Sequence, residues 1–236
     1  VMAQLTGEQR KLYLANQDRI AQQVQHREAS EFKKDKLKVL AELTKLRQIC
    51  CDPRLHYEDY KAGSAKLDAC MELVHGALDG GHHILLFSQF TGMLDIIGKR
   101  LAKEDIAFLK LTGASSKESR AKMVAQFQAG EVPVFLISLK AGGVGLNLTA
   151  ADVVIHYDPW WNVAAQDQAT DRAHRIGQQH TVTVYKLIAK DTIEERIMQM
   201  QESKRDLVNS VLGGDGISSA LFTREDVLAL LGGDGR

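Results

Sequence analysis

An alternation of short apolar runs with helical patterns fills the middle of the chain and constrains its fold more than any other feature. The segments that read as strands are the apolar run 84–87 and the stretches 106–111, 134–138, 153–157 and 181–187. Apolar residues at helical spacing, such as Leu94, Ile97 and Leu101, follow the first run. Parallel strands need crossover connections, and crossover helices cover both faces of a sheet. We therefore predict an α/β fold with a parallel sheet flanked by helices.

The segments on either side of this alternation are predicted to be helical. Residues 1–60 open with a capping-box spacing at Thr6 and keep apolar residues at helical spacing. After the last strand, a long helix is expected from Thr192 to Val211. Glycines at 213–216 then precede a last helical segment at 223–231. The expected division of the chain is 1–63, 64–212 and 213–236.

Composition narrows the class of protein. The chain has 44% hydrophobic and 25% charged residues and a formal net charge of zero, which is typical of an ordinary globular protein. Any nucleic-acid contact must then come from a local basic patch. No apolar run approaches the roughly 18 residues of a membrane span and no leader starts the chain, so we expect an intracellular protein without a membrane contact.

The cysteines and histidines give no sign of a metal site. Three cysteines with no C-x-x-C spacing argue against a disulfide framework and against zinc. We expect them to be small buried hydrophobes. The pair His82 and His83 precedes an apolar run and is better explained as the polar start of a strand. No metal ligands are predicted.

A segment rich in arginine, Gln168 to Gln178, offers the clearest chemistry. Gln168, Arg172 and Arg175 stand at i, i+4 and i+7, so on a helix their side chains share one face. Two guanidiniums at this spacing suit a polyphosphate, because each keeps its charge and offers a planar fork of donors. The alternative is a solvated helix face with an ordinary Asp171–Arg175 pair. The residues alone leave both open.

Small polar residues gather where the predicted strands end. An open parallel sheet binds its ligand at this edge. Gly113 lies one turn before Ser116 and Arg120, so a phosphate can meet a helix N-terminus and a guanidinium there, although a plain turn explains the same pattern. The four segments at strand ends are Ser88 to Phe90, Thr112 to Gly113, Ser138 to Asn147 and Asp158 to Asn162.

Two nucleotide-binding patterns are absent from the sequence. The glycines at 143 and 145 lack the third glycine of G-x-G-x-x-G, since position 148 is Leu, which disfavours a Rossmann-like oxidoreductase. No stretch reads G-x-x-x-x-G-K-[ST], and no Asp-Glu dipeptide offers carboxylates to magnesium. The nucleotide-binding half of an ATPase is therefore not encoded in these residues.

In order along the chain, the strand-end segments and the ending Arg175-Ile176-Gly177-Gln178 resemble the C-terminal helicase-type motifs of Swi/Snf-type DNA translocases, within the superfamily-two helicases. The flanking Ser64-Ala65-Lys66-Leu67 and Thr192-Ile193-Glu194-Glu195 agree. The resemblance implies that 64–212 form the second RecA-like lobe, 1–63 a helical protrusion and linker, and 213–236 a C-terminal brace. Val163 departs from the proline usual in the family.

The resemblance also implies roles for individual residues. Arg172 and Arg175 are expected to be arginine fingers on ATP with Mg²⁺, held mainly by the first RecA-like lobe of the parent chain. The nucleotide or the lobe interface is expected to be lined by Gln168, Gly143, Gly145 and Asn147. Contacts to double-stranded DNA are expected from Ser88, Gln89, Thr112, Gly113, Arg120, Ser138, Lys140 and Trp161.

The expected function is that of the C-terminal motor lobe of an ATP-dependent double-stranded-DNA translocase, of the type that remodels chromatin or other DNA–protein complexes. The parent is expected to be a DNA-dependent ATPase, and these residues alone to be inactive. Expected partners are duplex DNA, the first lobe and DNA-bound protein complexes, in a bacterial nucleoid or a eukaryotic nucleus. The alternative is a non-catalytic module that binds DNA or a partner.

Overall fold

The computed structural model describes residues 1–26, 29–142, 146–160, 163–171, 181–203 and 223–232. Its contacts divide the chain into two compact units. The first, called the sheet unit here, runs from Leu67 to Leu187 and includes Val1. The second, called the helical unit, combines residues 2–66 with those from Ile188 onward.

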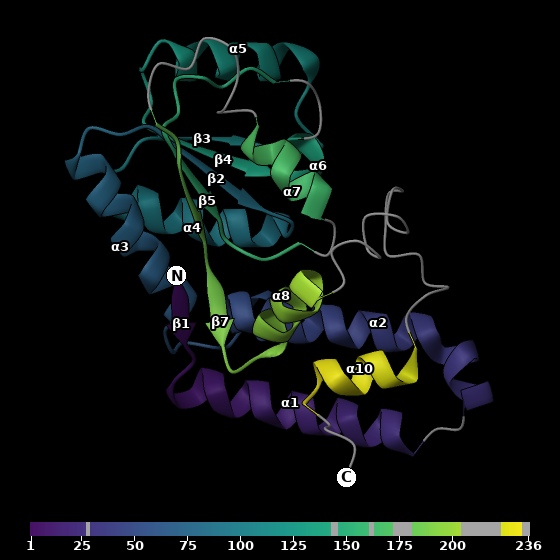
Figure 1. Ribbon diagram of the computed structural model, residues 1–236. Coiled ribbons are helices and arrows are strands. Elements are labelled where there is room, and N and C mark those ends of the chain that lie inside the picture. Colours follow the sequence, from purple (N-terminus) through teal and green to yellow (C-terminus); the bar gives the residue numbers. More distant parts are fainter. Residues whose placement is uncertain (27–28, 143–145, 161–162, 172–180, 204–222, 233–236) are drawn as a thin grey trace. The chain divides into compact units, whose positions relative to one another are not determined.

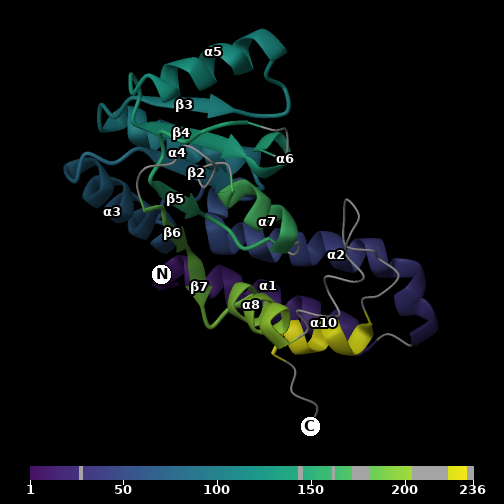
Figure 2. The same cartoon turned by 45° about the horizontal axis from the view of Figure 1, so that its top comes forward.

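The sheet unit is built on a five-stranded sheet in which every neighbouring pair is parallel. Its order is β3-β4-β2-β5-β6 (Figures 1 and 2, with β6 labelled in Figure 2). The strands are β2 (Ile84–Ser88), β3 (Phe108–Leu111), β4 (Val134–Ser138), β5 (Val153–His156) and β6 (Thr183–Lys186). Side chains of β2, β4 and β5 are buried throughout, which explains why they read as continuous apolar runs. The predicted parallel α/β fold is confirmed.

Helices cover both faces of this sheet. On one face, α4 (Thr91–Lys103) approaches closely, because a Cβ added to Gly98 would lie 3.0 Å from the ring of Phe108. On the other face, α5 (Lys117–Gln128) inserts the fully buried Phe127, which tilts against Phe135. Figure 1 shows α4 and α5 on opposite sides of the strands. The helix α7 (Val163–Thr170) adds the buried Ala169 to the same core as Phe127.

The helical unit contains most of the remaining elements. Its helices are α1 (Gly7–Gln25), α2 (Ala29–Cys51), the 3-10 turn η1 (Pro53–Leu55), α8 (Ile193–Ser203) and α10 (Arg224–Leu230), while α3 (Ala65–Asp79) starts in it and continues in the sheet unit. Figures 1 and 2 both show α10 beside α1 and α8. Gln17 donates to the Leu231 carbonyl and Arg196 to that of Leu230, so polar contacts anchor the end of α10.

A buried ion pair joins distant parts of the helical unit. Lys66 Nζ lies 2.9 Å and 2.8 Å from the two carboxylate oxygens of Glu194, and both side chains are 0% exposed. Glu194 also accepts a hydrogen bond from the Ala189 backbone amide. Removing either partner would leave an uncompensated buried charge, which costs about 3–5 kcal/mol. The pair therefore holds the start of α3 against the start of α8.

Several details differ from the sequence predictions. Thr6 stands at the N-cap of α1 without a side-chain cap hydrogen bond, so the predicted capping box does not form. A four-residue helix, α6 (Leu139–Gly142), occupies part of the segment Ser138 to Asn147, for which no helix was predicted. Two three-residue strands, β1 (Met2–Gln4) and β7 (Ile188–Lys190), pair in parallel and were not predicted. The predicted continuation of α8 to Val211 lies outside the described residues.

The three cysteines are buried, as predicted. Within the described ranges, no cluster of three or more histidine, cysteine, aspartate or glutamate side chains has the arrangement of a metal site. In the same residues, no helix combines the length and the apolar character that crossing a membrane requires.

Candidate functional site

The carboxyl ends of the parallel strands share one edge of the sheet, and most predicted site residues in the described part lie along it. Ser88 ends β2 directly opposite Ser138, which ends β4. Thr112 follows β3, and Asp158 follows β5 two residues after its end. Parallel pairing alone brings these positions together, because each strand enters the sheet from the same side.

Asp158 organises the polar side chains at the end of β2. This carboxylate is 1% exposed and accepts hydrogen bonds from Ser88 Oγ at 2.5 Å, from Gln89 Nε2 at 2.6 Å and from the Gln89 backbone amide at 3.2 Å. Burial of a charged carboxylate is tolerated because several donors satisfy it. The network joins the end of β2 to the loop that leads toward α7.

Ser88 and Ser138 are both buried, with Ser88 at 0% and Ser138 at 3% exposure. The Ser88 hydroxyl donates to Asp158 and accepts from the Phe90 backbone amide. Gln89 is only partly buried. Ser88 is thus engaged inside the protein, and a contact of its side chain with DNA stays a prediction. Sequence reasoning assigned no role to Asp158, since its partners lie about 70 positions away.

The turn after β3 presents an accessible backbone beside a helix N-terminus. Gly113 is exposed, and a Cβ built on it would meet nothing within 4 Å. Thr112 accepts from the Ala114 amide through its hydroxyl, while its own amide donates to Ser115 Oγ. Ser116 caps α5 by accepting from the Ser119 amide, which confirms the predicted start of this helix.

A groove of about 740 Å³ runs between α5 and the chain at 146–147. Arg120 and Asn147, predicted from the sequence for DNA and nucleotide respectively, both line it. Lys117 lines it as well, one helical turn before Arg120, a spacing that sequence reasoning did not use. Val124 and Leu146 supply an apolar floor. The groove combines two cationic side chains with an amide, which suits an anionic ligand.

Arg120 has an unsatisfied donor in this groove. Its side chain is half-buried, and its Nε atom is buried with no hydrogen-bond acceptor within the described residues. A buried donor without an acceptor costs about 1–3 kcal/mol. Phosphate oxygens are well suited to a guanidinium fork.

The remaining predicted site residues are only partly visible. Gln168 is exposed on α7. Lys140 belongs to α6, but its side chain is not among those described. The predicted residues that lie outside the described part of the chain are Gly143, Gly145, Trp161, Arg172 and Arg175.

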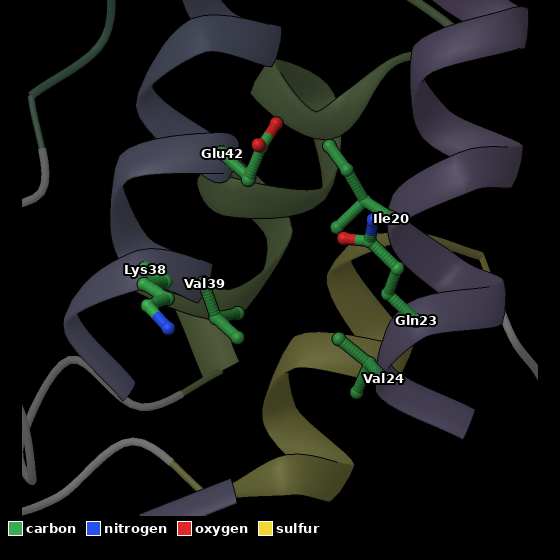
Figure 3. Close-up of a pocket in the computed structure, with 6 residues that line it drawn as sticks. All are labelled: Ile20, Gln23, Val24, Lys38, Val39 and Glu42. Atoms are coloured by element: carbon green, nitrogen blue, oxygen red, sulfur yellow. The ribbon is translucent and has the colours of Figure 1, made fainter. Parts of the chain in front are cut away.

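A second, smaller cavity of about 200 Å³ lies in the helical unit, between α1 and α2 (Figure 3). Ile20 and Val24 of α1 and Val39 of α2 are buried in its wall, while Lys38 and Glu42 supply polar groups. Glu42 is paired with Arg19 at 2.5 Å. None of the residues predicted for the site lines this cavity, which is mainly a packing feature of the two helices.

The whole fold has a counterpart among solved structures. The C-terminal domain of the SWI2/SNF2 ATPase of Sulfolobus solfataricus matches with a TM-score of 0.78 and 32% sequence identity, over 98% of this chain and 95% of that one. The chain belongs to the SWI2/SNF2 ATPase family. Its sheet unit is accordingly a RecA-like lobe, and residues 65–177 match the family described as "Helicase conserved C-terminal domain".

In longer relatives, the region that matches this chain is one part of a larger protein. The Sulfolobus solfataricus SWI2/SNF2 ATPase core, solved in complex with double-stranded DNA, matches 98% of this chain with 48% of its own length, at a TM-score of 0.81 and 35% identity. A protein of Mycoplasma pneumoniae named as an uncharacterized ATP-dependent helicase is 40% identical over 232 residues. This chain spans 22% of the length of that relative.

Proposed function

We propose that the chain is the C-terminal motor lobe of an ATPase that is stimulated by double-stranded DNA and moves along the duplex without separating its strands. The observation that carries the proposal is the groove beside α5, where Arg120 holds an unsatisfied donor and Lys117 and Asn147 lie close by. A translocase must grip phosphates without reading bases, and cationic side chains, hydroxyls and backbone amides do so.

The proposed DNA-binding surface follows the carboxyl edge of the sheet. Arg120, with the exposed backbone at Gly113, faces the phosphates, and Lys140 and Trp161 extend the contact. Gln89 and Thr112 complete the surface, and the buried Ser88 and Ser138 would support it from inside the protein, Ser88 through its bond to Asp158. The related Sulfolobus core was solved with double-stranded DNA, which supports duplex DNA as the ligand.

The proposed catalytic part is the pair Arg172 and Arg175. Arginines supplied across an interface stabilise the charge that develops on the γ-phosphate during phosphoryl transfer. Gln168, Asn147, Gly143 and Gly145 would line the nucleotide from this side. ATP and Mg²⁺ would be held mainly by the first RecA-like lobe of the parent protein, because these residues contain neither a phosphate loop nor an Asp-Glu pair. The chain alone would then be inactive.

The partners follow from the same proposal. They are duplex DNA, the first RecA-like lobe of the same parent chain and protein complexes bound to the DNA. The parent would act inside the cell on DNA, in a bacterial nucleoid or a eukaryotic nucleus.

The catalytic assignment is tested in the parent protein by Arg172→Ala and Arg175→Ala. Each variant is expected to lower DNA-stimulated ATP turnover by about 10³- to 10⁵-fold, the contribution typical of an arginine finger. Duplex affinity should change little, because the fingers face the nucleotide. Arg19→Ala, which removes an ion pair with Glu42 in the helical unit, is the matched control and should keep full turnover.

Steady-state phosphate release at saturating DNA is the measurement. Turnover within a few fold of the parent in either variant would show that the residue is not a finger. For Arg175, the ordinary pair with Asp171 would then be the better explanation.

A further inference from the structure

A buried histidine on the central strand β5 has no part in the site described so far. His156 is 1% exposed and stacks on Phe87 of β2, with ring centroids 5.5 Å apart and an angle of 20° between the planes. The two residues are direct partners in the sheet register. The imidazole is thus fixed on two sides, by its own strand and by the neighbouring ring.

Burial keeps this imidazole neutral. Desolvation, with a smaller contribution from Lys186 on the adjacent strand β6, lowers the pKa of His156 to about 3. A neutral imidazole has one nitrogen that donates and one that accepts. Its Nε2 atom lies 2.9 Å from Thr170 Oγ1, while the buried Nδ1 has no hydrogen-bond partner within the described part of the chain.

The tautomer follows from these two environments. A buried N–H without an acceptor is rarer and more costly than a buried acceptor without a donor. The proton therefore belongs on Nε2, where it is donated to the Thr170 hydroxyl. The bond joins a rigid strand in the middle of the sheet to the last residue of α7.

Such an anchor matters because α7 is only eight residues long. An isolated helix of this length is not stable in water, so contacts with the rest of the fold must fix its direction. Within its last turn, Ala169 is buried in the core of the sheet unit, whereas Asp167 and Gln168 are exposed. Ala169 has a small side chain and makes only a limited apolar contact with the core. The hydrogen bond from His156 to Thr170 adds a directional contact.

We propose that His156 is a positioning residue that acts through Thr170 to set where the chain leaves α7, two positions before Arg172. The inference rests on the proposed role of Arg172. Its physical basis is that catalysis by a charged group depends on position, and a displacement of about 1 Å can cost about a hundredfold in rate.

The test uses the full-length parent with Thr170→Val, which removes the hydroxyl but keeps the shape of the side chain. We expect the kcat for ATP to fall by about tenfold to a hundredfold, with the KM for ATP and the duplex affinity unchanged. Thr170→Ser retains the hydroxyl and should restore turnover. His156→Phe keeps the stacking on Phe87, removes the donor and should lower kcat to the same degree as Thr170→Val.

Two controls separate positioning from general damage and from failure of the finger assignment. Thr44→Val removes a comparable hydroxyl bond, from Thr44 to the Leu40 carbonyl in α2, and should leave kcat unchanged. Arg172→Ala is measured in parallel. If Arg172→Ala abolishes turnover while Thr170→Val and His156→Phe keep it within twofold, the positioning role is overturned and the finger stands. If Arg172→Ala retains turnover, the finger assignment fails and this proposal falls with it.

Discussion

His156 shows how burial controls the charge of a single residue. Its pKa is lowered to about 3 in the folded protein, against 6.5 for an ordinary histidine. Above pH 6.5 both the folded and the unfolded states are neutral at this position, and its contribution to stability is complete. Between pH 6.5 and 3, only the unfolded chain binds the proton, so stability falls as the pH falls.

This linkage predicts a difference between the protein and its His156→Phe variant. For each pH unit below 6.5, His156 is expected to lower the free energy of unfolding of the unsubstituted chain by about 1.4 kcal/mol. The variant lacks this contribution. Chemical denaturation of both proteins at pH 7, 6 and 5 measures it, since the other titrating groups are common to both. Parallel pH dependences would mean that His156 is not buried in its neutral form.

The sequence predicts which residues lie at the sheet edge, but not the bonds between them. The types and positions of Ser88, Gln89 and Arg120 predicted a phosphate-binding edge, and in the structure Ser88 and Gln89 lie at the carboxyl end of β2 while Arg120 belongs to α5. The carboxylate of Asp158, to which Ser88 and Gln89 are bonded, was not predicted as their partner. Hydrogen bonds between residues so distant in sequence depend on the register of two strands, which no local pattern encodes.

Among the elements, α5 bears most directly on ligand binding. Its N-terminus is capped by Ser116, its buried face carries Phe127, and Lys117 and Arg120 border the groove. One short helix therefore connects the hydrophobic core to the proposed DNA contact. This arrangement allows the contact to be removed without altering the packing.

Arg120→Ala is expected to weaken binding of duplex DNA by the isolated chain equally across DNA sequences. The slope of log affinity against log salt should become shallower by about 0.9, the value for one phosphate contact. Fluorescence anisotropy at several salt concentrations measures it. Lys103→Ala, an exposed lysine on α4 across the sheet, is the matched control. An unchanged slope for Arg120→Ala would place the DNA on another surface.

Elements with a strong pattern were predicted from the sequence, and short elements were not. The five strands of the sheet and the helix α5 follow from apolar runs and a serine cap. The strands β1 and β7 have three residues each and pair across almost the whole chain, so neither shows an alternation of its own. A capping box was predicted at Thr6 and does not form there. One is present at Thr223, where the Asp226 carboxylate accepts a hydrogen bond from the Thr223 backbone amide.

The chain forms two compact units. It leaves the helical unit after Lys66 and returns to it at Ile188. The buried pair of Lys66 and Glu194 lies near both crossing points in the sequence. Helical periodicity predicted the helices on either side of the sheet, but not that the first and last segments pack together. That association depends on contacts such as the one between Gln17 and the Leu231 carbonyl.

The zero net charge of the chain gives no general attraction to DNA, so the proposed duplex binding would depend on a few placed cations. The sequence contains no phosphate loop, and in the proposed function another lobe would complete the ATP site. Both features fit half of a two-lobed motor, in which neither half hydrolyses ATP by itself.

Phosphate release from ATP, measured for the isolated chain and for its full-length parent with and without duplex DNA, tests this account most directly. The isolated chain is expected to remain at the background rate in both conditions, while duplex DNA stimulates the parent. Two results would contradict the assignment of these residues as one lobe of a DNA-dependent ATPase. One is a parent whose phosphate release does not increase when duplex DNA is added. The other is phosphate release by the isolated chain that does increase with duplex DNA.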